Sequence, residues 1–146
     1  GRPVLEPDKI PVQAEGSQVV NEALLVDGKE YRMTCVSMGN PHAVIFVDQD
    51  VRELPLEQIG PSFENHERFP QRINTEIVRV LDRPTAEMRV WERGSGETLA
   101  CGTGTMACLL AQRGYRVVQE QRKPHNGQVF VNFVMEKRLG ETPHLH

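Results

Sequence analysis

The chain has 146 residues, of which 38% are hydrophobic and 25% are charged, and its formal net charge is −3. This composition suits one globular domain with a substantial core and argues against disorder. The small net charge indicates neither a nucleic-acid partner nor a polybasic membrane surface. No apolar run approaches the ~20 residues that a membrane-spanning helix needs. Three cysteines without paired spacing favour reduced thiols in a cytoplasmic protein.

The first half of the chain predicts strands joined by turns. Residues 1–18 contain three prolines and few apolar residues, so we expect an extended lead-in. A β-rich run over 19–26 and a second over 31–37 flank Asp27-Gly28, a pair typical of a hairpin turn. Gly39-Asn40-Pro41 then interrupts the chain. A buried strand over 43–47 and a short helix over 56–65, with Gly60-Pro61 inside it, are expected to follow.

The second half predicts more strands around one buried helix. Six consecutive apolar residues at 106–111, with Gly114 as a C-terminal cap, indicate a helix that is apolar all round and therefore central. Strands are expected on both sides of it, over 75–81, 86–92, 117–121 and 129–135. The sequence thus predicts one α+β domain over 1–146, a mostly antiparallel sheet wrapped around a central helix, with a disordered tail over 137–146.

Cys101 is the strongest candidate for chemistry. It precedes the expected central helix, whose first N–H groups have no partner within the helix and carry the positive end of its dipole. A thiolate is stabilised at such a place. Gly102 and Gly104 would let a bound carboxylate approach the same N–H groups. The spacing therefore favours proton removal from a carbon next to a carboxylate.

The other cysteines and the glycines have plainer interpretations. Cys35 falls within an expected strand and Cys108 within the apolar helix, where a cysteine is usually a small buried hydrophobe. The Gly102-Thr103-Gly104 run is not a phosphate-binding loop, because no Gly-Lys-Ser/Thr follows it. The histidines form no metal-ligand spacing with one another or with the cysteines, so we expect no metal site.

Four polar residues outside the cysteine loop are further candidates. Glu92 continues the face of Met88 and Val90 at the end of an expected strand, so it should point toward a pocket or a buried partner. Arg93 could grip a carboxylate with two parallel hydrogen bonds, or form a rim ion pair. His42 could tune a nearby thiol or cap a turn. Asn74 precedes a strand, where asparagine is common for turn reasons.

Four sequence motifs, taken in chain order, resemble motifs of the diaminopimelate epimerase family. They are Gly39-Asn40-Pro41-His42, Glu64-Asn65-His66 with Phe69-Pro70, Asn74-Thr75-Glu76, and the block from Glu92 to Gly104. The resemblance runs from about Tyr31 to Gly114. The last block, Glu-Arg-Gly-x-Gly-Glu-Thr-x-Ala-Cys-Gly-Thr-Gly, is highly specific, because related racemases and isomerases of this fold keep only part of it.

The resemblance implies a fold of two similar halves with the active site between them, of which this chain matches the C-terminal half. It implies that two thiols, without pyridoxal or another cofactor, move a proton between opposite faces of the substrate and interconvert LL- and meso-diaminopimelate for lysine and peptidoglycan synthesis. Cys101 would be one acid/base, and His42 and Glu92 would help set its protonation. Gly102 and Thr103 would bind the α-carboxylate through N–H groups. Four side chains would hold the substrate: Asn40, Asn74, Glu92 and Arg93.

The sequence departs from the family pattern at both ends. The motif that carries the family's other catalytic cysteine, in the N-terminal half, is absent, and so is the usual glycine-containing closing strand. We therefore expect a fragment that is inactive alone and needs the missing half or a partner chain, with a homodimer as a further option. Two alternatives stay open: a related racemase that acts on another acid, and a non-catalytic binding or assembly domain.

Overall fold

The computed structural model describes residues 3–82, 85–98, 115–125 and 128–137. These residues form one helix, two 3-10 turns and a sheet of eight strands, which confirms the predicted α+β class. The predicted central helix over 106–111 and the tail from residue 138 lie outside the described residues. The elements are η1 (Pro7–Lys9), β1 (Glu22–Val26), β2 (Lys29–Ser37), β3 (Pro41–Phe46), η2 (Val51–Glu53), α1 (Leu56–Glu64), β4 (Asn74–Asp82), β5 (Thr85–Glu92), β6 (Gly96–Thr98), β7 (Tyr115–His125) and β8 (Gln128–Lys137).

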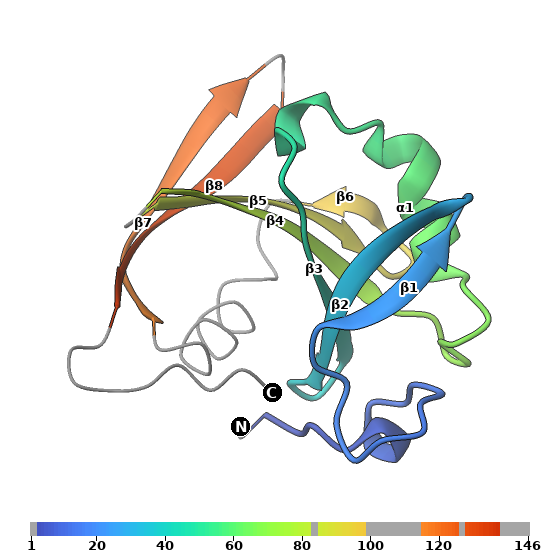
Figure 1. The fold of residues 1–146 in the computed structure, drawn as a ribbon. Helices are drawn as coiled ribbons and strands as arrows, with labels where there is room; N and C mark the ends of the chain where they lie inside the picture. The colour runs from blue at the N-terminus through green and yellow to red at the C-terminus, as the bar shows by residue number, and fades with distance from the viewer. Residues whose placement is uncertain (1–2, 83–84, 99–114, 126–127, 138–146) are drawn as a thin grey trace.

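The strands are ordered β1-β2-β3-β4-β5-β8-β7, and β6 pairs with β5 beside this path. The β7–β8 hairpin continues the curved sheet away from β1 and β2 (Figure 1). Among the strands that the structure describes, every pairing is antiparallel except that of β3 with β4. The sheet is therefore mostly antiparallel, as predicted, with one parallel pair at its centre.

The predicted hairpin is present as β1 and β2. Asp27 and Gly28 both have positive φ, 51° and 79°, as a two-residue turn between twisted strands requires. The first strand is shorter than expected and begins at Glu22 rather than at residue 19. Asn21 also has positive φ (49°), and its N–H donates to Thr34 Oγ1 at 3.0 Å, so the backbone leaves the extended conformation just before β1.

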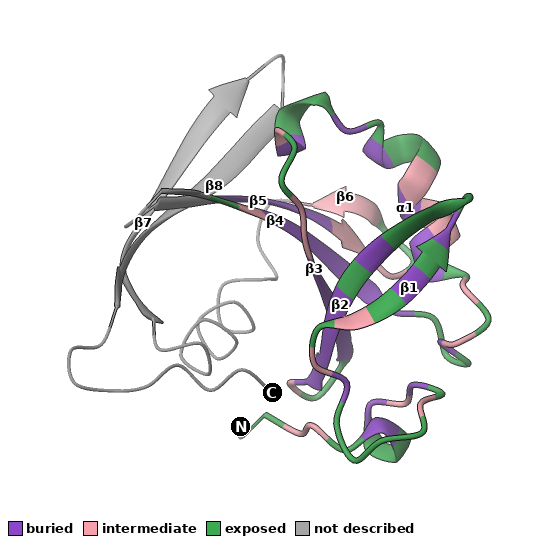
Figure 2. Cartoon of the chain, in the orientation of Figure 1, coloured by how far each residue is buried: buried purple, intermediate pink, exposed green. Residues whose placement is uncertain are grey.

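The parallel pair needs a crossover, and residues 47–73 form it, with η2 and α1 inside. Helix α1 packs against β1, β4, β5 and β6. Its Phe63 is fully buried and meets the ring of Tyr31 edge-on at 4.9 Å. The main hydrophobic cluster fills the space between this helix and one face of the sheet, where Ile45 and Ile77 are completely buried. Figure 2 shows that the buried positions concentrate on the central strands.

Glycine is favoured at position 60 because the indole of Trp91 lies directly on the helix. A Cβ at Gly60 would lie 2.2 Å from Trp91 Cδ2, closer than carbon atoms can approach. Gly96, on β6, faces the same ring, and a Cβ there would lie 3.6 Å from Cη2. The Gly60-Pro61 pair that weakens the sequence signal for a helix thus lies inside α1, and Gly60 allows the helix to dock on the sheet.

The lead-in is packed against the sheet rather than simply extended. It contains η1, and Val4 forms a bridge with Ser37 at the end of β2. Ile10 and Val12 are buried members of the main cluster. The prolines mislead because proline also starts a 3-10 turn readily, and Pro7 does so here.

A buried arginine joins the crossover to β5. Arg89 is 4% exposed, and its Nη1 donates to the carbonyl oxygens of Val51 and Leu54 at 2.9 and 2.8 Å. Its Nε and Nη2 donate to the two carboxylate oxygens of Glu97 on β6. This ion pair adds a side-chain contact to the backbone pairing of β5 with β6. No helix in the portion of the chain that the structure describes is long and apolar enough to cross a membrane.

Candidate functional site

Asn74 joins two turns that are far apart in the sequence. The parallel register places it beside His42, because β3 and β4 begin at the same edge of the sheet. Its side chain is 1% exposed, its Nδ2 donates to the Pro41 carbonyl oxygen at 3.0 Å, and its Oδ1 accepts from the Arg93 N–H at 2.7 Å. The buried amide of Asn74 therefore links the start of β3, next to His42, to the backbone of Arg93.

The buried ring of His42 orients the exposed side chain of Asn40. Its ring is 2% exposed, and Nε2 lies 2.9 Å from Asn40 Oδ1. An amide oxygen only accepts, so Nε2 is the donor in this bond. With its oxygen held by His42, the Asn40 amide has its NH₂ group available to donate to an acidic ligand. The ring therefore connects Asn40, on the surface, to Glu76, inside the sheet.

Glu76 is a functional candidate that sequence reasoning missed. It is completely buried, and its Oε1 lies 2.6 Å from His42 Nδ1. Its Oε2 has no hydrogen-bond partner among the described residues. Burial raises the pKa of Glu76, and the hydrogen bond with His42 partly lowers it. The available signal was alternation: Asn74 and Glu76 are two apart on a strand, so they share a face, and an acid on a buried face needs a partner.

Glu92 is the last residue of β5, and Arg93 lies in the turn that follows it. Ser95 N–H donates to the Glu92 carbonyl oxygen at 3.1 Å and closes this turn. Arg93 Nη1 donates to the Gln71 carbonyl oxygen at 3.1 Å, which directs the guanidinium along the crossover. Glu92 is half-buried and follows the buried face of Met88 and Val90. The local geometry thus holds an acid and a cation next to each other at the edge where β3 and β4 begin.

Contacts link four of the predicted site residues: the His42 ring bonds Asn40, and Asn74 bonds both Pro41, next to His42, and the Arg93 N–H. The fifth, Glu92, is the residue that precedes Arg93 in the chain. The other three, Cys101, Gly102 and Thr103, lie outside the described residues. Within residues 3–82, 85–98, 115–125 and 128–137, no group of three or more His, Cys, Asp or Glu side chains is arranged to hold a metal ion.

Cys35 belongs to the hydrophobic core. It lies on the opposite face of the sheet from His42, since it pairs with Ala43, and it is completely buried with its Sγ 3.7 Å from Met33 Sδ. Burial raises the pKa of its thiol strongly, and the positive charge of Arg68 lowers it only in part. A thiol that is neutral and covered is a poor nucleophile.

We expect Cys35 to resist alkylation in the folded protein. Iodoacetamide at pH 8 should leave it unmodified under native conditions and modify it fully in 6 M guanidinium, because only unfolding exposes the sulfur. Peptide mass spectrometry resolves the three cysteines separately, so Cys101 and Cys108 serve as internal comparisons. Native modification of Cys35 at the rate of a free thiol would contradict its placement in the core.

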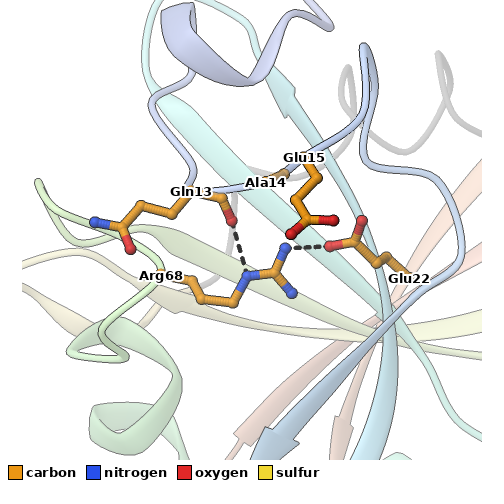
Figure 3. Close-up of a pocket in the computed structure, with 5 residues that line it drawn as sticks. All are labelled: Gln13, Ala14, Glu15, Glu22 and Arg68. Atoms are coloured by element: carbon orange, nitrogen blue, oxygen red, sulfur yellow. Dashed lines mark hydrogen bonds and ion pairs between the residues drawn. The ribbon is translucent and has the colours of Figure 1, made fainter.

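A separate cavity of about 550 Å³ is lined by Gln13, Ala14, Glu15, Glu22 and Arg68, none of them a predicted site residue. Figure 3 shows the Arg68 guanidinium reaching across it to Gln13 and Glu22. Arg68 donates to the carbonyl oxygens of Gln13 and Ala23 and forms an ion pair with the Glu22 carboxylate. These contacts tie the lead-in to β1, so Arg68 acts here as a structural clamp.

Comparison of the sequence with those of known proteins matches the chain to the diaminopimelate epimerase family. The sequence model of the diaminopimelate epimerase family matches residues 34–139. The diaminopimelate epimerase of Acetivibrio thermocellus is 57% identical over 111 residues, which are 76% of this chain and 39% of the relative. Those of Agathobacter rectalis and Moorella thermoacetica are 55% and 50% identical, over 77% and 84% of this chain and 43% of each relative.

The chain thus spans about two fifths of the length of the curated relatives it matches. The match includes every predicted site residue, since all of them lie between residues 34 and 139. The chain belongs to the diaminopimelate epimerase family, a family of isomerases.

Proposed function

We propose that this chain supplies the substrate-binding half of an epimerase that interconverts LL- and meso-diaminopimelate, with Cys101 as one of two acid/base thiols. The observation that carries the proposal is the bridge made by Asn74, whose amide contacts both Pro41 and Arg93. This bridge gathers groups suited to a zwitterionic amino acid: an outward amide at Asn40, a cation at Arg93 and an acid at Glu92.

In the proposed reaction the Cys101 thiolate removes the proton from the substrate α-carbon, and a second thiol donates its own proton to the opposite face. The C–H bond breaks on one side and a new C–H bond forms on the other, so no atom or electron is gained or lost. Arg93 binds a substrate carboxylate, and the N–H groups of Gly102 and Thr103 stabilise the negative charge that develops on the α-carboxylate. His42 and Glu92 help to set the protonation of the thiol.

The second thiol is expected to come from outside this chain. Cys35 is buried on the far face of the sheet, and Cys108 has no catalytic sequence context. One thiol can take a proton from one face but cannot return it to the other. The chain by itself should therefore bind substrate without epimerising it, and addition of the missing half should produce turnover.

The test uses the longest natural protein that contains this sequence, assayed for meso product from LL-diaminopimelate. Replacement of Cys101 by alanine should reduce turnover by about a thousandfold or more, as loss of a proton-transfer group does. Replacement of Cys35 by alanine should leave the chemical step intact. Turnover that survives in Cys101→Ala, or a wild-type protein that forms no meso product, would overturn the proposal.

A further inference from the structure

The carboxylate of Glu64 is the meeting point of three segments. Glu64 is the last residue of α1 and is 6% exposed. Its Oε1 accepts from Trp91 Nε1 at 2.9 Å, and its Oε2 accepts from the Gly94 N–H at 3.0 Å and from Arg72 Nη1 at 2.8 Å. A buried carboxylate with three donors is a strongly determined contact, because each bond involves a charged group.

These contacts hold the turn that carries Arg93. Two consecutive backbone N–H groups of this turn donate to side chains from different elements: Arg93 N–H to Asn74 Oδ1 on β4, and Gly94 N–H to Glu64 Oε2 on α1. Gly94 has a φ of +79°, which fixes the direction of the chain at this point. The turn is therefore clamped from two sides, and the position of Arg93 depends on both clamps.

We infer that Glu64 is a positioning residue that sets the place of the Arg93 guanidinium for the substrate carboxylate. The inference rests on the proposed function, because it assigns Glu64 an effect on a bond that Arg93 makes to substrate. Glu64 acts through the backbone of the turn, at a single residue's distance from Arg93.

The charge of Glu64 matters as well as its shape. All three of its partners are donors, and a carboxylate only accepts. The amide of glutamine would turn an NH₂ group toward one of them, so at least one donor would face another donor. Glu64→Gln should therefore keep the size of the side chain but weaken all three bonds by removing the negative charge, and it should release either Trp91 Nε1 or the Gly94 N–H together with Arg72.

A merely structural role predicts a different result from a positioning role. If Glu64 only stabilises the fold, its loss should lower the melting temperature and the fraction of active protein, with KM unchanged. If it positions Arg93, its loss should raise KM in the protein that remains folded. In a protein that already carries Arg93→Ala, the loss of Glu64 should cause no further rise in KM.

The experiment compares four variants of the longest natural protein that contains this sequence: Glu64→Gln, Arg93→Ala, the double variant, and Glu57→Gln. Glu57 is an exposed glutamate in the first turn of the same helix and so provides a matched control. Glu64→Gln should raise KM for LL-diaminopimelate about 10- to 100-fold, as loss of a charged hydrogen bond does, with a smaller change in kcat. Glu57→Gln should behave as wild type, and the double variant should match Arg93→Ala.

Each outcome bears on one of the two claims. Turnover that depends on Arg93 but is as insensitive to Glu64→Gln as to Glu57→Gln would overturn the role of Glu64 alone. If the increases in KM from Glu64→Gln and Arg93→Ala combine fully in the double variant, the role of Glu64 would likewise be overturned. Wild-type protein without turnover would overturn the proposed function, and this role with it. If Glu64→Gln does not fold, Glu64→Asp takes its place. Aspartate keeps the charge beside Arg72 but is too short to reach the Gly94 N–H, so KM should still rise. An unchanged KM in Glu64→Asp would overturn the inference.

Discussion

Replacement of His42 by alanine should lower the free energy of unfolding by about 3–5 kcal/mol at neutral pH, the loss typical when one partner of a buried pair is removed. The reason is Glu76, which is completely buried and would lose the contact of its Oε1 with the His42 ring. Its Oε2 already lacks a partner among the described residues. Urea unfolding followed by circular dichroism measures the change.

The pH dependence of this loss has a definite sign. Burial raises the pKa of Glu76 above its ordinary value of 4.5, and the hydrogen bond with His42 limits that rise. A carboxyl with a raised folded-state pKa contributes stability below its unfolded value and loses it as the pH rises through the folded value. The deficit of His42→Ala should therefore be largest at neutral pH and shrink below pH 4.5.

Two further variants test the same explanation. His66→Ala is the matched control, because His66 is only partly buried and bonds a carbonyl oxygen of β1 through Nε2. His66→Ala should lower the free energy of unfolding at pH 7 much less than His42→Ala does. The double variant His42→Leu, Glu76→Leu should recover part of the loss, since it leaves no buried charge unpaired. Equal deficits for His42→Ala and His66→Ala at every pH would contradict the role assigned to Glu76.

Gly60→Ala should destabilise the fold by about 1–2 kcal/mol net. The added methyl group would lie 2.2 Å from Trp91 Cδ2 and 2.6 Å from Cε3, so the indole must move or α1 must lift. Overpacking of this kind costs about 1–3 kcal/mol or more, and the helix preference of alanine over glycine offsets about 1 kcal/mol. Trp91 is the only tryptophan in the sequence, so its fluorescence emission should shift together with the melting temperature.

Gly16→Ala is the control for Gly60→Ala. A Cβ at Gly16 would meet the Gln18 carbonyl oxygen at 3.5 Å, an ordinary contact. Its stability should stay within about 0.5 kcal/mol of wild type, as for most exposed substitutions. A neutral effect of Gly60→Ala with unchanged emission would show that the indole does not lie on the helix as described.

Features set by neighbouring residues could be predicted from the sequence. Asp27-Gly28 indicated a hairpin because both residues tolerate positive φ, and the structure has that turn. The helix around Gly60-Pro61 was also predicted, within one residue of its observed end. The predicted strand start at residue 19 was wrong because Asn21 leaves the extended region, and the signal for this was the asparagine itself, which adopts positive φ more readily than most residues.

Features set by distant residues could not be predicted from pattern alone. The parallel pairing of β3 with β4 brings His42 to Asn74, and nothing in either strand specifies a parallel partner. Glu64 resembles a surface acid in the sequence, and the alternation that places Glu76 on the face of Asn74 does not identify its partner. The importance of both acids depends on hydrogen-bond partners that lie 30 residues away, at Gly94, and 34 residues away, at His42.

The crossover between β3 and β4 has a consequence for how the site forms. Asn74 reaches Pro41 across 33 residues, so the entropy of closing that loop must be overcome before these contacts are made. Asn40 and Arg93 should therefore take up their places late in folding and together. Once the loop is closed, extra length costs little, since doubling a loop adds only about 0.6 kcal/mol. Insertions at the exposed Asp48-Gln49 should therefore leave the pairing of β3 with β4 intact.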